Sequence, residues 1–344
     1  MAPLIRVLHP QQCAAWDDYV ITAPEGTFFH RAAWRDIITA AFRHRTHYVF
    51  AEQDGVLSGV LPLVHMRSLL FGNRLVSLPF CVYGGPLAND PASAQALTDH
   101  AIDLAKRLRA DVIEFRMREP FALDWASRSD LYATFRRPIT AEPEQNLKAI
   151  PRKQRAVVRK AFENRLHWNI GRDVGSFYRI YSESVRNLGT PVFSRRYFRL
   201  IADHFPDCSE VLTVVDDDGP LSAVLSFFFR DEVLPYYGGG VPRARQRGAF
   251  DFMYWQVMNQ AATERGVRLF DFGRSKFGTG SFAFKKNWGF APQPLNYQYW
   301  LRPGQTIPDH NPLNPKYRLM IEGWKRLPLP VANLLGPPIV RGIG

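Results

Sequence analysis

The stretch Asp54-Gly-Val-Leu-Ser-Gly-Val60 recurs as Asp218-Gly-Pro-Leu-Ser-Ala-Val224, 164 positions further along the chain. The block Phe29-x-Arg31-x-x-x-Arg35-x-Ile37 recurs as Phe193-x-Arg195-x-x-x-Arg199-x-Ile201 with the same offset of 164. Two shorter pairs follow in the same order: Tyr83-Gly84-Gly85 with Tyr237-Gly238-Gly239, and Asp111–Phe115 with Arg268–Phe272. Two blocks at one offset, followed by two further pairs in the same order, indicate a tandem duplication.

Both copies show the same order of predicted elements. Apolar residues at three- and four-residue spacing predict two helices, and an Asp-Gly turn between two apolar runs predicts a hairpin. A strand leading into Tyr-Gly-Gly, a long helix and a last strand complete each copy. The predicted helices are 11–22, 31–42 and 93–108 in copy one, and 174–187, 195–204 and 250–265 in copy two. The predicted strands are 47–52, 57–64 and 112–116, and 211–215, 222–229 and 268–272.

This order predicts an α/β (α+β) fold with mixed, mostly antiparallel sheets flanked by helices. We place the first domain at 1–145 and the second at 146–302. A proline-rich, basic tail spans 303–344, and its prolines predict irregular structure. We expect the tail to pack along the body of the protein, with contact to a membrane surface as the alternative.

The composition is that of a globular protein, with 46% hydrophobic and 22% charged residues in 344. The first twelve residues contain no apolar stretch, so we expect no signal peptide. Three scattered cysteines argue against a disulfide framework or a zinc site, and we expect no metal and a cytoplasmic location. The net charge of +12 favours polyanionic partners, or reflects a surplus of surface arginine.

The segment 269–290 is the strongest candidate for a site. A buried-type strand leads to Asp271, Arg274, Ser275 and Lys276, and then to a glycine-rich loop. Polar groups at the point where a strand meets a glycine-rich loop are a common way to build a site. Cations there can bind phosphate or stabilise an oxyanion during acyl transfer.

A second candidate is the loop Arg243–Ala249, which precedes the long helix of copy two. Exposed amides at a helix start, together with Arg245, Arg247 and Gly248, favour an anion such as a pyrophosphate. The matching loop of copy one, 88–93, has no basic residue. A third basic stretch, 148–165, predicts a cationic helix that contacts nucleic acid, anionic lipid or a pyrophosphate-bearing substrate, or is simply solvated.

These residues resemble the FemAB family, closest to FemAB-related proteins associated with the exosortase (PEP-CTERM) and exopolysaccharide systems. The resemblance is carried by Phe270–Phe290 and by the leader Ile150–Arg155. It implies tandem GNAT-fold transferases that move amino acids from aminoacyl-tRNA to peptidoglycan precursors. The family's Phe-Lys-Lys motif falls on Phe284-Lys285-Lys286, which makes Lys285 the residue most like its transition-state-stabilising lysine.

The resulting hypothesis is an acyltransferase that moves an acyl or aminoacyl group to an amine or hydroxyl of an anionic envelope precursor or lipid-linked sugar. Acyl-CoA or aminoacyl-tRNA would be the cosubstrate, with no permanently bound cofactor, and the protein could associate peripherally with the inner membrane. Lys285 would stabilise negative charge and Asp271 would act as a base or orienter. The predicted substrate-binding residues are Arg274, Ser275, Lys276, Tyr236, Tyr237, Lys286 and Trp288, and the predicted donor-phosphate residues are Arg245, Arg247 and Gly248.

Two alternatives stay open. The first is a non-catalytic, degenerate GNAT pair that serves as a binding or scaffold component of polysaccharide or exosortase machinery. The second is general binding to nucleic acid, which predicts an affinity that falls steeply with salt.

Overall fold

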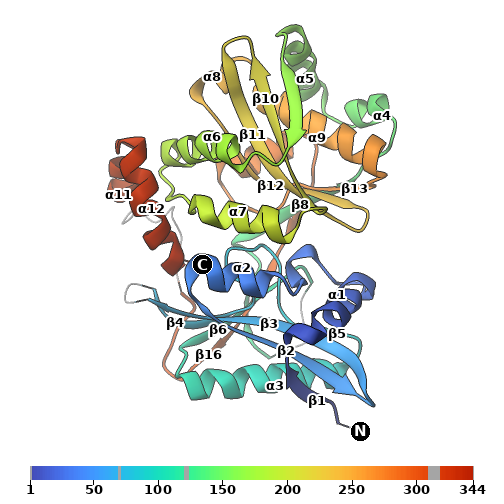
Figure 1. Ribbon diagram of the computed structural model, residues 1–344, viewed down its shortest axis with the longest axis vertical. Helices are drawn as coiled ribbons and strands as arrows, with labels where there is room; N and C mark the ends of the chain where they lie inside the picture. The colour runs from blue at the N-terminus through green and yellow to red at the C-terminus, as the bar shows by residue number, and fades with distance from the viewer. Residues whose placement is uncertain (1, 69–70, 120–123, 309–317, 344) are drawn as a thin grey trace. The chain divides into compact units, whose positions relative to one another are not determined.

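The computed structural model describes residues 2–68, 71–119, 124–308 and 318–343 (Figure 1). The chain forms two compact units, one made of residues 1–131, 294–310 and 341–344, and the other of residues 132–293 and 311–340. We call them unit 1 and unit 2.

Unit 1 contains one mixed sheet with helices on both faces (Figure 1). Helix α3 covers one face, where Leu97 and Ala101 pack against the strand residues Leu61 and Leu63. The strand order is β1 (Leu4–Val7), β2 (Arg45–Gln53), β3 (Val56–Ser68), β4 (Gly72–Val76), β6 (Val112–Met117), β16 (Asn296–Leu301) and β7 (Ala126–Arg128), with β5 (Leu87–Ala88) paired to β3. The helices are η1 (Pro10–Gln12), α1 (Cys13–Thr22), η2 (Phe28–His30), α2 (Trp34–Phe42) and α3 (Pro91–Leu108).

Unit 2 repeats this plan. Its strand order is β14 (Ser275–Lys276), β8 (Tyr132–Pro138), β13 (Leu269–Asp271), β12 (Glu232–Gly240), β11 (Gly219–Phe229), β10 (Ser209–Asp216) and β9 (His167–Gly171), with β15 (Pro292–Pro294) paired to β8. Its helices are α4 (Pro143–Lys148), α5 (Arg152–Glu163), α6 (Val174–Asn187), α7 (Arg195–His204), α8 (Pro242–Gln246), α9 (Ala249–Arg265), α10 (Gly280–Asn287), α11 (Arg318–Lys325) and the larger part of α12 (Leu329–Ile343).

Glycines on β12 let helices approach both faces of this sheet. A Cβ atom on Gly238 would lie 2.9 Å from the Tyr254 hydroxyl of α9, and one on Gly239 would lie 2.8 Å from Ser184 Cβ of α6. Because successive strand residues face opposite sides, α6 and α9 lie on opposite faces. The Tyr-Gly-Gly repeat in copy two is therefore a packing requirement of the helix–sheet–helix layers.

The two sequence copies exchange a strand. Strand β8 precedes residue 145 but pairs with β13 and β14 of unit 2, and β16 comes late in the chain but pairs with β6 and β7 of unit 1. Each exchanged strand lies between two strands of its host sheet. The compact units therefore do not follow the boundaries expected at 145 and 302, because periodicity within a copy carries no information about which sheet receives its last strand.

Two local predictions were wrong. In copy one, β4 ends at Val76 and does not run into Tyr83-Gly84-Gly85, because Leu78 and Phe80 take left-handed backbone angles of 64° and 68°. The tail, expected to be irregular, forms α11 and α12, and α12 contains Pro337 and Pro338. The stabilisation from packing of the small residues Ala332 and Gly336 against unit 2 outweighs the loss of the backbone hydrogen bonds that the prolines cannot donate.

Candidate functional site

The segment 269–290 lies at one end of the unit 2 sheet as a strand, a tight turn, a second short strand and a helix. Strand β13 ends at Asp271, and Gly273 turns the chain with a φ of 66° into β14. Gly278 turns it again with a φ of 76°, and the Thr279 side chain accepts a hydrogen bond from the Phe282 amide to cap α10. The glycine-rich segment is thus two left-handed turns that bring α10 back against β13 and β14.

Lys285 reaches back from α10 to the turn after β13. Its Nζ donates to the carbonyl oxygens of Gly273 at 2.9 Å and Arg274 at 3.0 Å. The rings of Phe135 and Phe272 flank the ammonium, with centroids 5.6 and 5.9 Å away. Burial lowers the pKa of Lys285 to about 7; the charge of Asp271 opposes this shift and that of Arg274 adds to it. The lysine is therefore poised to hold or release a proton near neutral pH.

Asp271 is fully buried and is held by three groups. Its carboxylate accepts from the Gly273 amide at 2.7 Å and from the Thr134 hydroxyl at 3.1 Å, and forms an ion pair with Arg136 at 3.3 Å. Arg136 also pairs with Glu232 on β12. These contacts shape the turn whose carbonyls receive Lys285, so the geometry favours the orienting role for Asp271 over that of a base.

Two cations from the same segment share one aromatic ring. The guanidinium carbon of Arg274 lies 4.6 Å from the centroid of Tyr132, and the Nζ of Lys276 lies 5.6 Å from it. Ser275, between them, is buried and pairs in the β14 register with Ala133. Positive charge is thus concentrated beside β8, next to the Lys285 turn.

Strand β12 is irregular where it passes this turn. Leu225 pairs with Tyr237 but Ser226 pairs with Pro235, so Tyr236 is an extra, bulged residue. Strand β12 pairs with β13 only at Glu232 and Val233. Beyond Val233, in the described part of the chain, the two strands no longer pair.

The two tyrosines of β12 have different surroundings. A Cβ atom on Gly273 would lie 4.0 Å from Tyr236 Cδ2, which places Tyr236 beside the Lys285 turn. Tyr237 is buried, and its hydroxyl lies 2.9 Å from the Tyr197 hydroxyl within an aromatic cluster of α6 and α7. Of the pair, Tyr236 is the one that lines the candidate site.

Trp288 and Lys286, both predicted to bind substrate, also differ. Trp288 is fully buried, and its Nε1 donates to Asp251 of α9 at 2.9 Å; Gln154 of α5 donates to the same carboxylate. Burial raises the pKa of Asp251, and the two hydrogen bonds oppose that rise. Trp288 therefore joins α10 to α9 and α5 in the core instead of facing a substrate, whereas Lys286 is exposed.

The predicted anion loop is partly occupied by α5. Gly248 caps α9 with a φ of 69°, and a Cβ atom there would lie 3.1 Å from Ala161 Cβ. Arg247 donates to the Asn164 carbonyl at 2.7 Å, and Asn164 donates back to the Arg247 carbonyl at 2.9 Å. Of the predicted donor-phosphate residues, Arg245 is exposed, whereas Arg247 is also held 3.5 Å from the Asp216 carboxylate.

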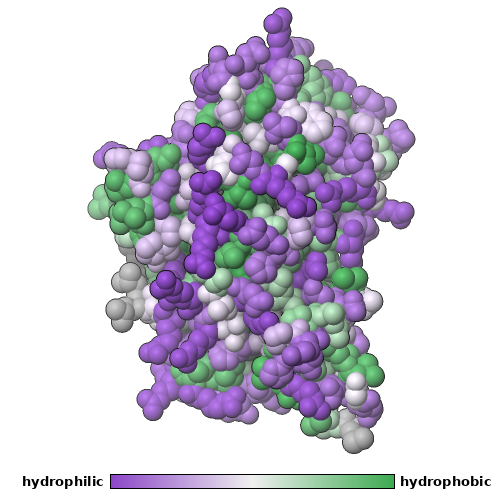
Figure 2. All heavy atoms as spheres, in the orientation of Figure 1, coloured by the Kyte–Doolittle hydropathy of each residue, from purple (hydrophilic) through white to green (hydrophobic). Residues whose placement is uncertain are grey.

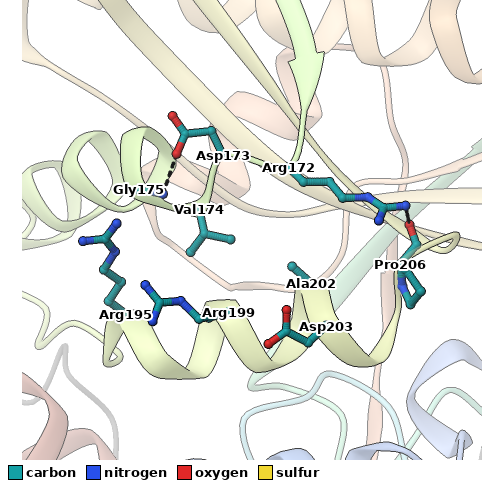
Figure 3. A pocket seen from close by; sticks show the side chains of 9 residues that line it. All are labelled: Arg172, Asp173, Val174, Gly175, Arg195, Arg199, Ala202, Asp203 and Pro206. Carbon is teal, nitrogen blue, oxygen red and sulfur yellow. Dashed lines mark hydrogen bonds between the residues drawn. The ribbon is translucent and has the colours of Figure 1, made fainter.

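A separate hollow of about 580 Å³ lies between α7 and the start of α6 (Figure 3). Arg195 and Arg199 point from α7 toward the first turn of α6, which Asp173 caps by accepting from the Gly175 amide at 2.8 Å (Figure 3). Arg172 turns away to the Pro206 carbonyl (Figure 3). Asp203 also lines the hollow, so its charges nearly balance. The second-copy arginines of the repeated block, Arg195 and Arg199, thus line a surface hollow between α6 and α7.

Sequence reasoning missed the contribution of β8. Tyr132, Thr134, Phe135 and Arg136 surround the Lys285 turn, but they precede the expected domain boundary. Polar and apolar residues alternate here as in an ordinary strand, so no signal in the sequence assigns these residues to the second sheet.

Residues 147–286 match the acetyltransferase (GNAT) domain family. The fold is a tandem of GNAT domains. Among solved structures, FemX superposes with a TM-score of 0.64 at 16% identity, covering 92% of this chain and all of that one. A tandem GNAT protein from the clavulanic acid biosynthesis pathway gives 0.55 at 12% identity, covering 89% of this chain and all of its own. No curated protein matches the chain in sequence.

The C-terminal domain of a putative lysylphosphatidylglycerol synthetase from Agrobacterium fabrum also shares the fold. Its TM-score is 0.55 at 12% identity, and the alignment covers 84% of this chain and 91% of that one. At identities this low, these superpositions establish the fold alone. The GNAT domain in residues 147–286 supports an N-acyltransferase, and this range contains Asp271, Lys285 and the bulged strand β12.

Proposed function

We propose that the protein is an acyltransferase of the FemAB type, which transfers an acyl or aminoacyl group to an amine or hydroxyl of a cell-envelope precursor. The observation that carries this proposal is Lys285, a half-buried ammonium fixed by two carbonyls close to the point where β12 and β13 cease to pair. Unit 2 would carry the reaction.

The chemistry follows from the donors of Lys285. An ammonium has three N–H groups, and the Gly273 and Arg274 carbonyls accept two of them. The third can be donated to the oxygen that becomes negative when the acceptor attacks the carbonyl of the donor. A fixed donor in a desolvated setting stabilises such charge more than water does. Asp271 would position the turn, and Tyr236 would border the reacting groups.

Arg274 and Lys276 would hold an anionic substrate beside Tyr132. Acyl-CoA and aminoacyl-tRNA both carry phosphate, and both fit a basic chain. The partial coverage of the α9 start by α5 leaves Arg245 as the residue that would contact a CoA pyrophosphate.

The acceptor would be a peptidoglycan-type precursor or a lipid-linked sugar of an exopolysaccharide system. The similar folds of FemX and of the putative lysylphosphatidylglycerol synthetase domain support an envelope or lipid-linked acceptor. An exosortase (PEP-CTERM) context is part of this proposal, as is a cytoplasmic protein peripheral to the inner membrane. The alternative is a non-catalytic GNAT pair that binds the same precursors.

The pH dependence of transfer tests the role of Lys285. If the ammonium stabilises the developing oxyanion, kcat/KM falls above pH 7, because the pKa of Lys285 is about 7 and the charged form is lost as pH rises. The pH profile of a Lys285→Arg variant, which stays charged, should lack this fall. A wild-type kcat/KM that rises through pH 7 with a hydroxyl acceptor would instead indicate that the neutral amine acts as a base.

Equilibrium binding at two salt concentrations identifies the donor. Saturable binding of acetyl-CoA that Arg245→Ala weakens would indicate a thioester donor; we expect a loss of roughly ten- to hundred-fold, typical of one charge-assisted contact. Binding of aminoacyl-tRNA above the level seen with uncharged tRNA would indicate the Fem-type reaction. An Arg302→Ala variant in unit 1 is the matched control for lost charge. Binding of neither donor would favour the non-catalytic alternative, and equal affinity for arbitrary RNA would favour general nucleic-acid binding.

A further inference from the structure

Half of the exposed large hydrophobic side chains in the described chain gather on one part of unit 2. They are Leu188 at the end of α6, Leu319 and Met320 on α11, and Val331, Leu334, Leu335 and Ile339 on α12. Green, apolar atoms collect at the left edge of Figure 2, where Figure 1 places α11 and α12. We call these seven residues the apolar face.

Helix α12 is apolar on its inner and its outer side. Ala332, Gly336 and Val340 are buried, and Gly336 approaches Val192 so closely that a Cβ atom would lie 2.8 Å from its backbone. The outer side still presents Leu334, 75% exposed, and Leu335, 45% exposed. A helix that is apolar all round is normally covered by an apolar environment. The inner side of α12 is covered by the rest of unit 2. We therefore expect the outer side to be covered by another apolar partner.

The apolar face is held firmly on unit 2. Arg186 donates to the carbonyls of Lys325 and Leu327, both at 3.2 Å, and so closes the turn between α11 and α12. Gly189 lies against Ile321, where a Cβ atom would come within 2.4 Å of the isoleucine side chain. Leu188 therefore continues the surface formed by α11, and the seven side chains form a preformed platform.

The charges around the apolar face are positive. Residues 319–343 contain Lys325, Arg326 and Arg341 against the single acid Glu322, which is paired with Lys325. Helix α12 itself has no acidic residue. Apolar side chains with basic neighbours on short helices are the features of a segment that lies in the headgroup region of an anionic bilayer.

We propose that the apolar face docks unit 2 onto an anionic membrane surface, with α11 and α12 lying in the interface. This deepens the peripheral location given under the proposed function and rests on it for the idea that the acceptor is lipid-linked. No helix in the described residues is long and apolar enough to cross a bilayer. Such docking would bring the protein to an acceptor that is confined to the membrane.

Sedimentation with vesicles tests the docking without any transfer reaction. The full chain is mixed with vesicles of phosphatidylcholine alone or with one third phosphatidylglycerol, which contain neither donor nor acceptor. We expect binding to the anionic vesicles, with an affinity that Leu334→Ser together with Leu335→Ser lowers by about ten-fold or more. Arg326→Gln should lower the affinity by about five-fold, and only for the anionic vesicles.

The matched control is Leu4→Ser together with Val56→Ser, two exposed apolar positions of unit 1 that are 60% and 68% exposed. Circular dichroism and thermal unfolding establish that all variants are folded. Absence of binding to anionic vesicles, or equal loss in the control pair, would overturn the proposal. So would a stable dimer that the Leu334 and Leu335 substitutions dissociate, since a second copy would then cover the face. Because no turnover is measured, these outcomes are independent of whether the transferase proposal holds.

Discussion

The Lys285→Ala substitution is expected to lower kcat/KM for group transfer by about 10²–10³-fold, the usual effect of removing one oxyanion donor. The ammonium nitrogen is already fixed by the carbonyls of Gly273 and Arg274, so it needs no reorganisation when charge develops. Loss of the side chain should act mainly on kcat, because the interaction forms in the transition state and not in the bound substrate. The measurement is the steady-state kcat and KM of the wild type and the variant, with the donor that the binding experiment identifies.

The control for this result is Lys106→Ala, an exposed lysine in unit 1 that removes the same charge. The Lys285→Ala variant should also unfold at no lower denaturant concentration than the wild type, because a half-buried ammonium whose pKa is lowered by desolvation contributes little net stability. A folded Lys285→Ala protein with full transfer activity would remove Lys285 from the mechanism. Arg274 and Lys276 would then be the candidates for stabilising the developing negative charge.

The Trp288→Ala substitution is expected to lower the free energy of unfolding by about 3–5 kcal/mol, the range for deleting a buried aromatic side chain. Trp288 is fully buried, and its ring lies 5.8 Å from Phe272 and 6.1 Å from Phe284 by centroid. Urea unfolding followed by circular dichroism measures the change.

The Trp288→Phe substitution separates packing from hydrogen bonding. It keeps most of the ring but removes the Nε1 donor, which leaves the buried Asp251 with one partner fewer, at a cost of about 1–3 kcal/mol. Because the tryptophan is structural, the folded Trp288→Phe protein should keep its KM. A raised KM with unchanged stability would place Trp288 at the substrate, as predicted from the sequence.

Most helices and strands of the two copies could be predicted because each has a regular apolar pattern. The predicted helices 174–187 and 195–204 coincide with α6 and α7, and the predicted hairpin at Asp218-Gly219 joins β10 to β11. Helices α11 and α12 were missed because the proline rule describes an isolated helix, whereas small inward-facing residues hold α12 against unit 2.

The candidate site could be predicted only from its continuous part. Asp271, Arg274 and Lys285 occur close together in the sequence, and the structure brings them to one turn. The β8 residues that flank them come from 130 to 150 positions earlier, and the bulge at Tyr236 arises from strand register, which no local pattern encodes. Two residues close in the sequence that were both predicted to bind substrate also differ in burial: Trp288 lies in the core, and Lys286 is exposed to solvent.

The exchange of β8 and β16 has a consequence for the order of events during biosynthesis. The sheet of unit 1 lacks a strand between β6 and β7 until residue 301 has left the ribosome, by which time nearly all of unit 2 has been translated. The amino-terminal half therefore cannot complete its sheet while nascent, and a gene cut at the midpoint of the duplication encodes two fragments that each lack a strand. Each half of the duplication therefore depends on the other for one strand of its sheet.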